Sequence, residues 1–307
     1  MEKFNNILVF HDTMAEPSFA VRRAAKLARR NMARLTIVDF APTHDALLAT
    51  LVPVIAEFEA KEEAERTSRL QDLARRIHDE FELTPTVELL RGRPLVELTK
   101  MIARQHYDLL MKDANANTED LFFGSLDMRL LRYCPVPLWL TNPTSPENMT
   151  RILVAIDPLA DEASEGVNRR IAHIASLLAH REQCELHVVA VWKRPFDSLA
   201  NDTEYLQGYD GHSKTVEAKA RERLNQLLMS SVTSVKPERV HLVSGTINDE
   251  IMKVVTSIDP DVLVMGSLAR RGIAGILIGN TAEKVFRLVG CSILTVKPEN
   301  FQSPILN

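Results

Sequence analysis

Two hydrophobic periods alternate along this chain. Short runs of Val, Ile and Leu, as at residues 6–10 and 151–156, have the length of strands, and nearly every position in them is apolar. Between such runs, small side chains recur at helical spacing, as at Ala20, Ala24 and Ala28. Strands that are apolar at every position are buried on both faces. The pattern therefore predicts parallel sheets covered by helices, an α/β fold.

The order of these elements occurs twice. The strand-like runs are residues 6–10, 35–38, 87–90, 107–111 and 138–140 in the first copy and 152–156, 186–191, 240–243, 260–265 and 292–296 in the second. The first run of each copy leads to an aspartate, Asp12 or Asp157. We therefore predict two tandem doubly wound domains, at residues 1–142 and 149–300, joined by a polar linker that contains proline.

Charge and hydropathy limit the class of protein. The formal net charge is -4 over 307 residues, which gives no reason to expect nucleic acid or a membrane as a partner. The N-terminus has no basic region followed by a long apolar run, as a signal peptide would. The longest apolar runs also fall short of the roughly 20 residues that span a bilayer. We therefore expect a cytoplasmic protein.

The segment after the fourth strand of the second copy carries the clearest chemistry. Parallel sheets bind ligands beyond the carboxyl ends of their strands. Glycines such as Gly266 and Gly279, thirteen positions apart, let backbone amides approach phosphate oxygens. Asn280 and Thr281 stand at a predicted helix start, where free amides attract phosphate, and Glu283 has capping-box spacing from Asn280.

This segment resembles the phosphate motif of the universal stress protein family, G-x2-G-x9-G followed by Ser or Thr. The two-copy plan resembles that family over nearly the whole chain. The resemblance implies a five-stranded parallel sheet of order 3-2-1-4-5 in each domain and ATP bound in the second domain, with Asp157 on the adenine and ribose side. Two positions depart from the motif, because Ala269 replaces the middle glycine and Asn280 follows Gly279. Asn280 still offers a helix cap and an amide donor.

The candidate nucleotide-binding residues of the second domain lie at three strand ends and in the loop. They are Ala155, Asp157, Val191, Met265, Gly266, Leu268, Ala269, Arg270, Gly279, Asn280 and Thr281. Mg²⁺ would be held largely by the phosphates of ATP. The sequence lacks a G-x4-G-K-[ST] loop, a G-x-S-x-G elbow and a metal motif. We therefore expect no catalytic residues and, at most, slow ATP hydrolysis.

The first copy retains little of the motif. Lys112 is interpreted as the replacement of its first glycine, and Asp113 adds negative charge that disfavours phosphate. Only Asp12, Gly124 and Ser125 correspond to the motif. The first domain is therefore expected to be structural, an internal partner of the second.

Several other segments have ordinary interpretations. The charged run 61–66 is expected to be a solvated helix face, and His187 and His241 to be interior or edge residues of strands. Residues 195–212 form an insertion that is either a solvated loop or a lid. The apolar stretch 41–60 either packs between domains or covers a non-polar pocket.

These features favour one hypothesis for the function and leave one alternative hypothesis open. The first hypothesis is a stress-response protein that binds ATP in its second domain and acts as a regulatory or signalling module. In similar proteins the last strands pair, which would join residues 138–140 to 294–296 within the chain, and a homodimer is possible. The rival is a scaffold or a small hydrophobic-ligand-binding module whose phosphate loop is vestigial.

Overall fold

The structure is a computed structural model that describes residues 3–14, 18–42, 53–114, 125–193, 206–231, 235–267 and 280–306. The chain divides into two compact units, which correspond to the two sequence copies. Unit 1 contains the described residues up to 145 and also residues 301–306, and unit 2 contains those from 146 to 300. The C-terminal tail therefore packs with unit 1, which the sequence did not predict. The limits predicted for the two domains, residues 1–142 and 149–300, stay a prediction.

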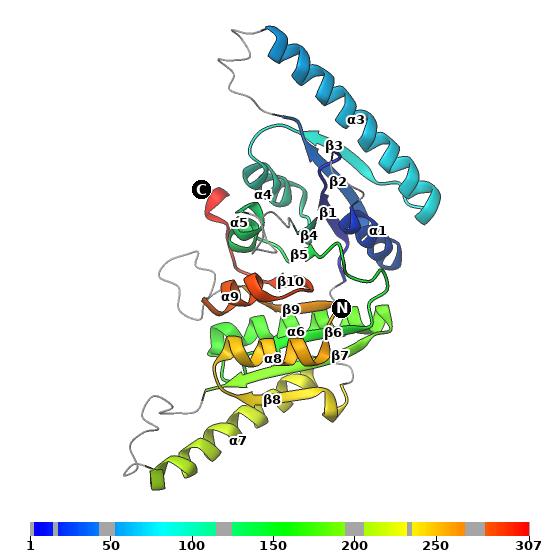
Figure 1. Ribbon diagram of the computed structural model, residues 1–307. Helices are drawn as coiled ribbons and strands as arrows, with labels where there is room; N and C mark the ends of the chain where they lie inside the picture. The colour runs from blue at the N-terminus through cyan, green and yellow to red at the C-terminus, as the bar shows by residue number, and fades with distance from the viewer. Residues whose placement is uncertain are drawn as a thin grey trace. The chain divides into compact units, whose positions relative to one another are not determined.

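In unit 1, strands alternate with helices (Figure 1). The elements are β1 Asn6–Phe10, α1 Phe19–Asn31, β2 Arg34–Phe40, α3 Pro53–Phe81, β3 Thr86–Leu90, α4 Pro94–Gln105, β4 Leu109–Asp113, α5 Ser125–Tyr133 and β5 Leu138–Thr141, with a short 3₁₀ turn, Pro304–Leu306, in the tail. The strand order is β3-β2-β1-β4-β5, and each neighbouring pair is parallel.

Unit 2 repeats this plan. Its elements are β6 Arg151–Ile156, α6 Glu162–Glu182, β7 Glu185–Trp192, α7 Leu206–Ser231, a 3₁₀ turn Pro237–Arg239, β8 Val240–Ser244, α8 Ile247–Ile258, β9 Val262–Gly266, α9 Asn280–Leu288 and β10 Ser292–Val296. Its strand order is β8-β7-β6-β9-β10, again parallel throughout. Both units therefore confirm the predicted doubly wound fold of order 3-2-1-4-5.

The apolar runs form the central strands because both faces of each sheet are covered. In unit 1 the inner strands β1 and β4 carry the fully buried residues Ile7, Leu8, Val9, Leu109, Leu110 and Met111. Unit 2 has Ile152, Leu153, Val154, Leu263 and Val264 at the same places. Within the described ranges, no helix is long and apolar enough to cross a membrane.

The two units also repeat a polar clamp at the amino-terminal edge of the sheet. Asp108, just before β4, accepts hydrogen bonds from the backbone amides of Asn5 and Asn6 at 2.7 and 3.0 Å. Asp261, just before β9, accepts from Thr150 and Arg151 at 2.5 and 2.9 Å. Each carboxylate thus holds the start of the first strand beside the fourth and fixes their register.

The strand register corrects one sequence interpretation. Val9 pairs with Met111 in unit 1, and its counterpart Val154 pairs with Val264 in unit 2. Two residues further on, Asp113 therefore corresponds to Gly266, so the interpretation of Lys112 as the replacement of the first glycine was wrong by one position. Lys112 instead corresponds to Met265 and is buried, 2.9 Å from Asp127.

A glycine after the third strand of each unit has a backbone that other residues rarely adopt. Gly92 and Gly245 have φ of 111° and 152°. A Cβ at Gly245 would lie 2.8 Å from Oε1 of Glu250. By contrast, Gly166 is exposed on helix α6, and a Cβ there would meet nothing within 4 Å.

These two glycines predict substitutions of opposite sign. Gly245→Ala is expected to lower the free energy of unfolding by about 1–3 kcal/mol, since the backbone is strained for alanine and the Cβ clashes. Gly166→Ala is expected to raise it by about 0.5–1 kcal/mol, because alanine loses less entropy than glycine in a helix. Urea unfolding followed by circular dichroism measures both. Equal effects of the two variants would contradict this reading of the backbone.

Candidate functional site

The predicted site residues of unit 2 gather at the carboxyl edge of three neighbouring strands. Asp157 follows β6, and Gly266 ends β9. β6 lies between β9 and β7, with Val154 paired to Val264 and Ile156 paired to Ala190. Ala155, Val191 and Met265 are therefore close to this edge, and Val191 and Met265 are buried.

The phosphate half of the predicted site falls largely outside the described residues. This applies to Leu268, Ala269, Arg270 and Gly279. Helix α9 begins at Asn280, as the capping pattern predicts, but the side chains of Asn280 and Thr281 are not described. In unit 1, Gly124 is also outside the described residues, and Ser125 begins helix α5.

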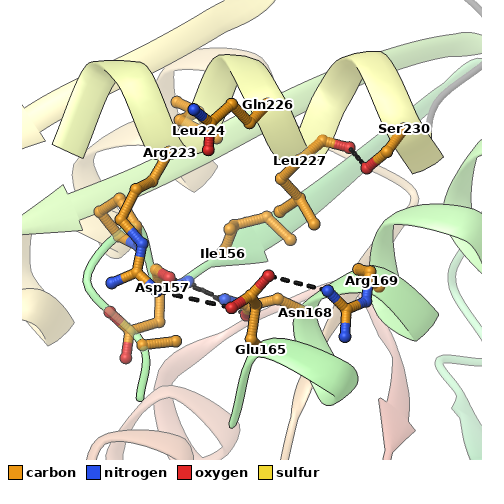
Figure 2. A pocket seen from close by; sticks show the side chains of 12 residues that line it. Ile156, Asp157, Glu165, Asn168, Arg169, Arg223, Leu224, Gln226, Leu227 and Ser230 are labelled. Atoms are coloured by element: carbon orange, nitrogen blue, oxygen red, sulfur yellow. Dashed lines mark hydrogen bonds and ion pairs between the residues drawn. The ribbon is translucent and has the colours of Figure 1, made fainter. Parts of the chain in front are cut away.

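A cavity of about 120 Å³ lies beside Asp157 in unit 2 (Figure 2). The loop after β6, the first half of α6 and the second half of α7 line it. Ile156, Leu224 and Leu227 supply apolar walls, while Asp157 and Asn168 supply polar ones. Of the predicted candidates that the structure describes, only Asp157 lines this cavity.

Asn168 holds the backbone at Asp157. Its Nδ2 donates to the carbonyl oxygen of Asp157 at 2.7 Å, and its Oδ1 accepts from the amide of Asp157 at 3.3 Å. The carboxylate of Asp157 in turn accepts from the amide of Leu159 at 3.1 Å. These bonds set the position of the carboxylate at the cavity wall. The sequence analysis missed Asn168, because one asparagine in a helix carries no recognisable signal.

Charged side chains from two helices meet at the rim of this cavity. Glu165 of α6 lies 2.8 Å from Arg169 on the same helix and 3.6 Å from Arg223 on α7. Figure 2 shows both guanidinium groups directed toward Glu165. The three residues are about one third to one half exposed, so the pairs are adjustable and each contributes little to stability. The rim therefore presents two cations that a ligand can reach.

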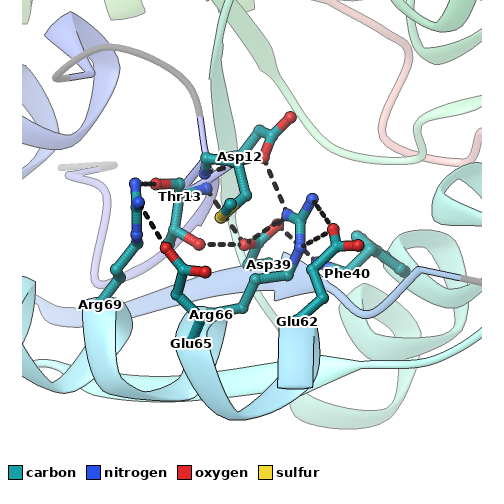
Figure 3. Close-up of polar contacts among 9 residues, drawn as sticks. Asp12, Thr13, Asp39, Phe40, Glu62, Glu65, Arg66 and Arg69 are labelled. Carbon is teal, nitrogen blue, oxygen red and sulfur yellow. Dashed lines mark hydrogen bonds and ion pairs between the residues drawn. The ribbon is translucent and has the colours of Figure 1, made fainter. Parts of the chain in front are cut away.

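The same edge of unit 1 is filled by an internal ion network (Figure 3). Arg66 of α3 donates to both carboxylate oxygens of Asp39, at 2.9 and 3.1 Å, and to Asp12 at 2.8 Å. Its other nitrogens donate to Glu62 at 3.0 and 3.1 Å. The side chain of Arg66 is only 12% exposed and that of Asp39 only 1%. The prediction that residues 61–66 are a solvated face is therefore wrong for Arg66.

The partners of Asp39 explain why a carboxylate is tolerated there. Besides Arg66, the hydroxyl of Thr13 donates to it at 2.5 Å and the amide of Phe40 at 2.7 Å. Burial opposes the charged form of Arg66, but Asp39 and the hydrogen bonds to Glu62 and Asp39 outweigh it, so the pKa of Arg66 is raised. The guanidinium is therefore permanently charged in this network.

A second carboxylate closes the end of β4, which lies on the other side of β1 from Asp39. Asp113, at the end of β4, accepts from the amide of Ala20 and from the hydroxyl of Thr141, both at 2.7 Å, and from the hydroxyl of Ser18. Ser18 is the N-cap of α1, so this carboxylate occupies the positive end of that helix. Burial lowers the pKa of the adjacent His11, although Asp113, Asp39 and Asp12 act to raise it.

The register shows what unit 2 has in these two places. Phe10 pairs with Val38, and its counterpart Ala155 pairs with Val189, so the next residue in each strand is Asp39 in unit 1 and Ala190 in unit 2. Asp113 corresponds to Gly266 in the same way. Two buried or partly buried carboxylates of unit 1 are thus replaced in unit 2 by the smallest uncharged residues. In the described part of the chain, no group of three or more His, Cys, Asp or Glu is placed to hold a metal ion.

Comparison with known proteins places this geometry in a family. The model of the universal stress protein family matches the chain twice, over residues 3–142 and 148–297. Universal stress protein E of Photorhabdus laumondii is 24% identical over 99% of this chain and 98% of its own length. The protein of the same name from Escherichia coli K12 is also 24% identical, over the same shares.

Solved structures agree on the fold. A putative universal stress protein from Pseudomonas aeruginosa UCBPP-PA14 has a TM-score of 0.74 with 22% identity, over 97% of this chain and 94% of that one. A universal stress protein from Archaeoglobus fulgidus gives 0.63 with 18% identity, over 96% and 97%. On the two family matches, which together cover nearly all of its residues, the chain belongs to the universal stress protein family.

Proposed function

We propose that unit 2 binds an adenine nucleotide, ATP, at the carboxyl edge of its sheet, and that this binding serves as a regulatory signal in the stress response. One observation carries the proposal. The strand ends that unit 1 fills with Asp39 and Asp113 hold Ala190 and Gly266 in unit 2, next to a cavity at Asp157.

Electrostatics favour an anionic ligand in unit 2 over unit 1. A triphosphate brought to the edge of unit 1 would meet Asp12, Asp39 and Asp113. The groups that donate hydrogen bonds to these carboxylates are already engaged by them. The negative charges of the carboxylates and of the phosphates would repel each other, which disfavours binding. In unit 2 the corresponding positions are uncharged except for Asp157, and the rim carries two arginines, Arg169 and Arg223, for one carboxylate, Glu165.

The sequence supplies the phosphate side of the proposal. Gly266 and Gly279 keep the interval of the family motif, and α9 begins at Asn280. Amides at a helix start, together with Arg270, offer donors to phosphate oxygens. Asp157 would then accept from the ribose or adenine, and Mg²⁺ would be bound through the phosphates.

Unit 1 is proposed to act as the structural partner. Its described strand ends are closed by bonds within the chain, and these ends leave a nucleotide no place comparable to the edge of unit 2. Pairing of the two units within the chain, and a homodimer, belong to the same proposal as the contacts on which nucleotide binding would act. Hydrolysis would be slow, because no residue is assigned to catalysis.

Matched aspartates test the location of the site. Asp157→Asn is expected to weaken ATP binding about tenfold, since it removes a charged acceptor while keeping a side chain that can still accept from Leu159. Asp12→Asn, its counterpart in unit 1, is expected to leave the affinity unchanged. Isothermal titration calorimetry with ATP, with and without Mg²⁺, measures both. Gly279→Val tests the loop and is expected to abolish binding.

The same titration separates the proposal from its rival. A wild-type chain that gives neither heat nor a thermal shift with ATP at about a millimolar concentration would sink the nucleotide proposal, because a ligand of the folded state must stabilise it. That result would favour the scaffold or hydrophobic-ligand module. Equal weakening by Asp157→Asn and Asp12→Asn would move the site away from unit 2. Phosphate release from the same samples reports any hydrolysis.

The ion network of unit 1 predicts a stability effect without a binding effect. Arg66→Ala leaves Asp39 buried without its cation, and we expect the free energy of unfolding to fall by about 3–5 kcal/mol. Arg75→Ala removes a bridge to Asp72 on the same helix, but Arg75 is 75% exposed. This control is expected to change stability by no more than about 0.5 kcal/mol. Urea unfolding gives the energies, and ATP titration of the folded Arg66→Ala chain should match the wild type.

A further inference from the structure

Two histidines of unit 2 meet across neighbouring strands. His187 lies on β7 and His241 on β8, with Nε2 of His241 3.5 Å from Nδ1 of His187. Glu185, also on β7, places Oε2 3.4 Å from Nε2 of His187. The three side chains form a continuous chain from carboxylate to imidazole to imidazole. At the same places unit 1 has Thr36 and Glu88, so the chain is specific to unit 2.

The two rings meet edge to edge through their nitrogens. Their planes differ by 11°, and their centroids are 5.8 Å apart. The centroid distance exceeds the nitrogen–nitrogen distance by about two ring radii, which is the arrangement of coplanar rings joined by a hydrogen bond. In rings stacked face to face, the two centroids would lie much closer together than the 5.8 Å found here. The contact is therefore directional, and it depends on which of the two facing ring nitrogens carries a proton.

Glu185 determines which ring nitrogens carry protons when both histidines are neutral. An ionised carboxylate only accepts hydrogen bonds, so Nε2 of His187 carries a proton and donates it to Glu185. Nδ1 of neutral His187 is then an acceptor, and His241 must donate from its Nε2. Arg239 is hydrogen-bonded to the other oxygen of Glu185, which holds that carboxylate in place.

Few other charges act on this pair. The side chain of His187 is 13% exposed, and His241 is partly buried. Among the charged residues of α8, the helix that packs on β7 and β8, Lys253 is bound by Glu250 at 2.7 Å. Asp249 lies in the first turn of that helix, and Asp259 beyond its end lies 3.8 Å from Arg151. Helices α6 and α7 and the 3₁₀ turn before β8 also contact β7. Glu185 is the charged group that the structure places against His187, and Arg239 contacts Glu185.

We propose that Glu185, His187 and His241 form a proton-responsive fastening that holds the outer strand β8 to β7 while the two imidazoles share a hydrogen bond, and loosens it when both are protonated. β8 is the last strand in the order of unit 2 and is paired with β7 alone among the described strands. The fastening does not depend on nucleotide binding.

The proton balance explains the response. One added proton binds the bare Nδ1 of His241, and its Nε2 still donates to His187. A second proton must go to Nδ1 of His187. Two N–H groups and two positive charges then face each other, and the hydrogen bond is lost. A positive charge on one ring therefore acts against a positive charge on the other.

The pH window follows from the direction of the shift. Burial lowers the pKa of His241, and the neighbouring His187 lowers it further. In the unfolded chain His241 takes up its proton near the ordinary value of about 6.5, whereas the folded chain takes it up at lower pH. The stabilisation that depends on neutral His241 is thus complete above that ordinary value and falls as the pH drops toward the lowered one, while the hydrogen bond itself is lost only once both rings are protonated.

Hydrogen exchange of the native full-length chain tests the fastening. Between about pH 7 and about pH 5, protection of the β8 amides is expected to fall roughly tenfold more than that of β9, after correction for intrinsic exchange. His241→Gln keeps an N–H donor for His187 but does not titrate, so its β8 protection should stay level. His180→Gln changes an exposed histidine of α6 and should behave as the wild type.

Either of two results would overturn the proposal. One is a wild-type chain whose β8 protection does not fall with pH, and the other is an equal fall in His241→Gln. If that variant fails to fold, nitrogen NMR of the wild-type imidazoles decides the question. Two separated protonation steps for His187 and His241 support the fastening, whereas two independent titrations near the ordinary pKa refute it.

Discussion

A carboxylate buried at the end of a parallel strand must be compensated by a cation or by several donors, and this constraint separates the two halves of the chain. In unit 1, Arg66 and Thr13 compensate Asp39, while the start of α1 compensates Asp113. The compensation comes from the chain itself, so the edge is complete without a ligand. In unit 2 the same positions are Ala190 and Gly266, and no compensation is required.

The scaffold that presents these two edges is nearly the same. Asp108 and Asp261 clamp the first strand to the fourth, and Gly92 and Gly245 make the same turn after the third. Residues that hold the fold were therefore kept in both copies, while residues at the strand ends diverged. Since the clamps lie at the opposite edge of the sheet from the site, a strand end can change without loss of register. This separation lets the strand ends differ between the two copies while the fold stays the same.

The fold could be predicted from the sequence because each strand and helix pattern occurs twice, once in each copy. The position of Asp157 at a strand end and the start of α9 at Asn280 follow from local pattern, whereas the strand order was implied by the resemblance to the family. The Arg66–Asp39 pair could not be predicted, because it joins residues 27 positions apart and charged runs on helices are usually solvated. The shift from Lys112 to Asp113 needed the strand register, which a sequence aligned by its glycines does not contain.

Strand β7 connects the two proposals for unit 2. Glu185 and His187 stand near its beginning and fasten it to β8, whereas Ala190 stands near its end, beside the crevice of β6 and β9. β7 is packed between β6 and β8, so its position depends on both pairings. Loosening β8 removes the pairing of β7 with β8 and exposes that side of β7 to water. The backbone groups on that side of β7 then lose their strand partners. A change in protonation at one end of β7 thereby acts on the strand whose other end borders the edge where we propose that the nucleotide binds.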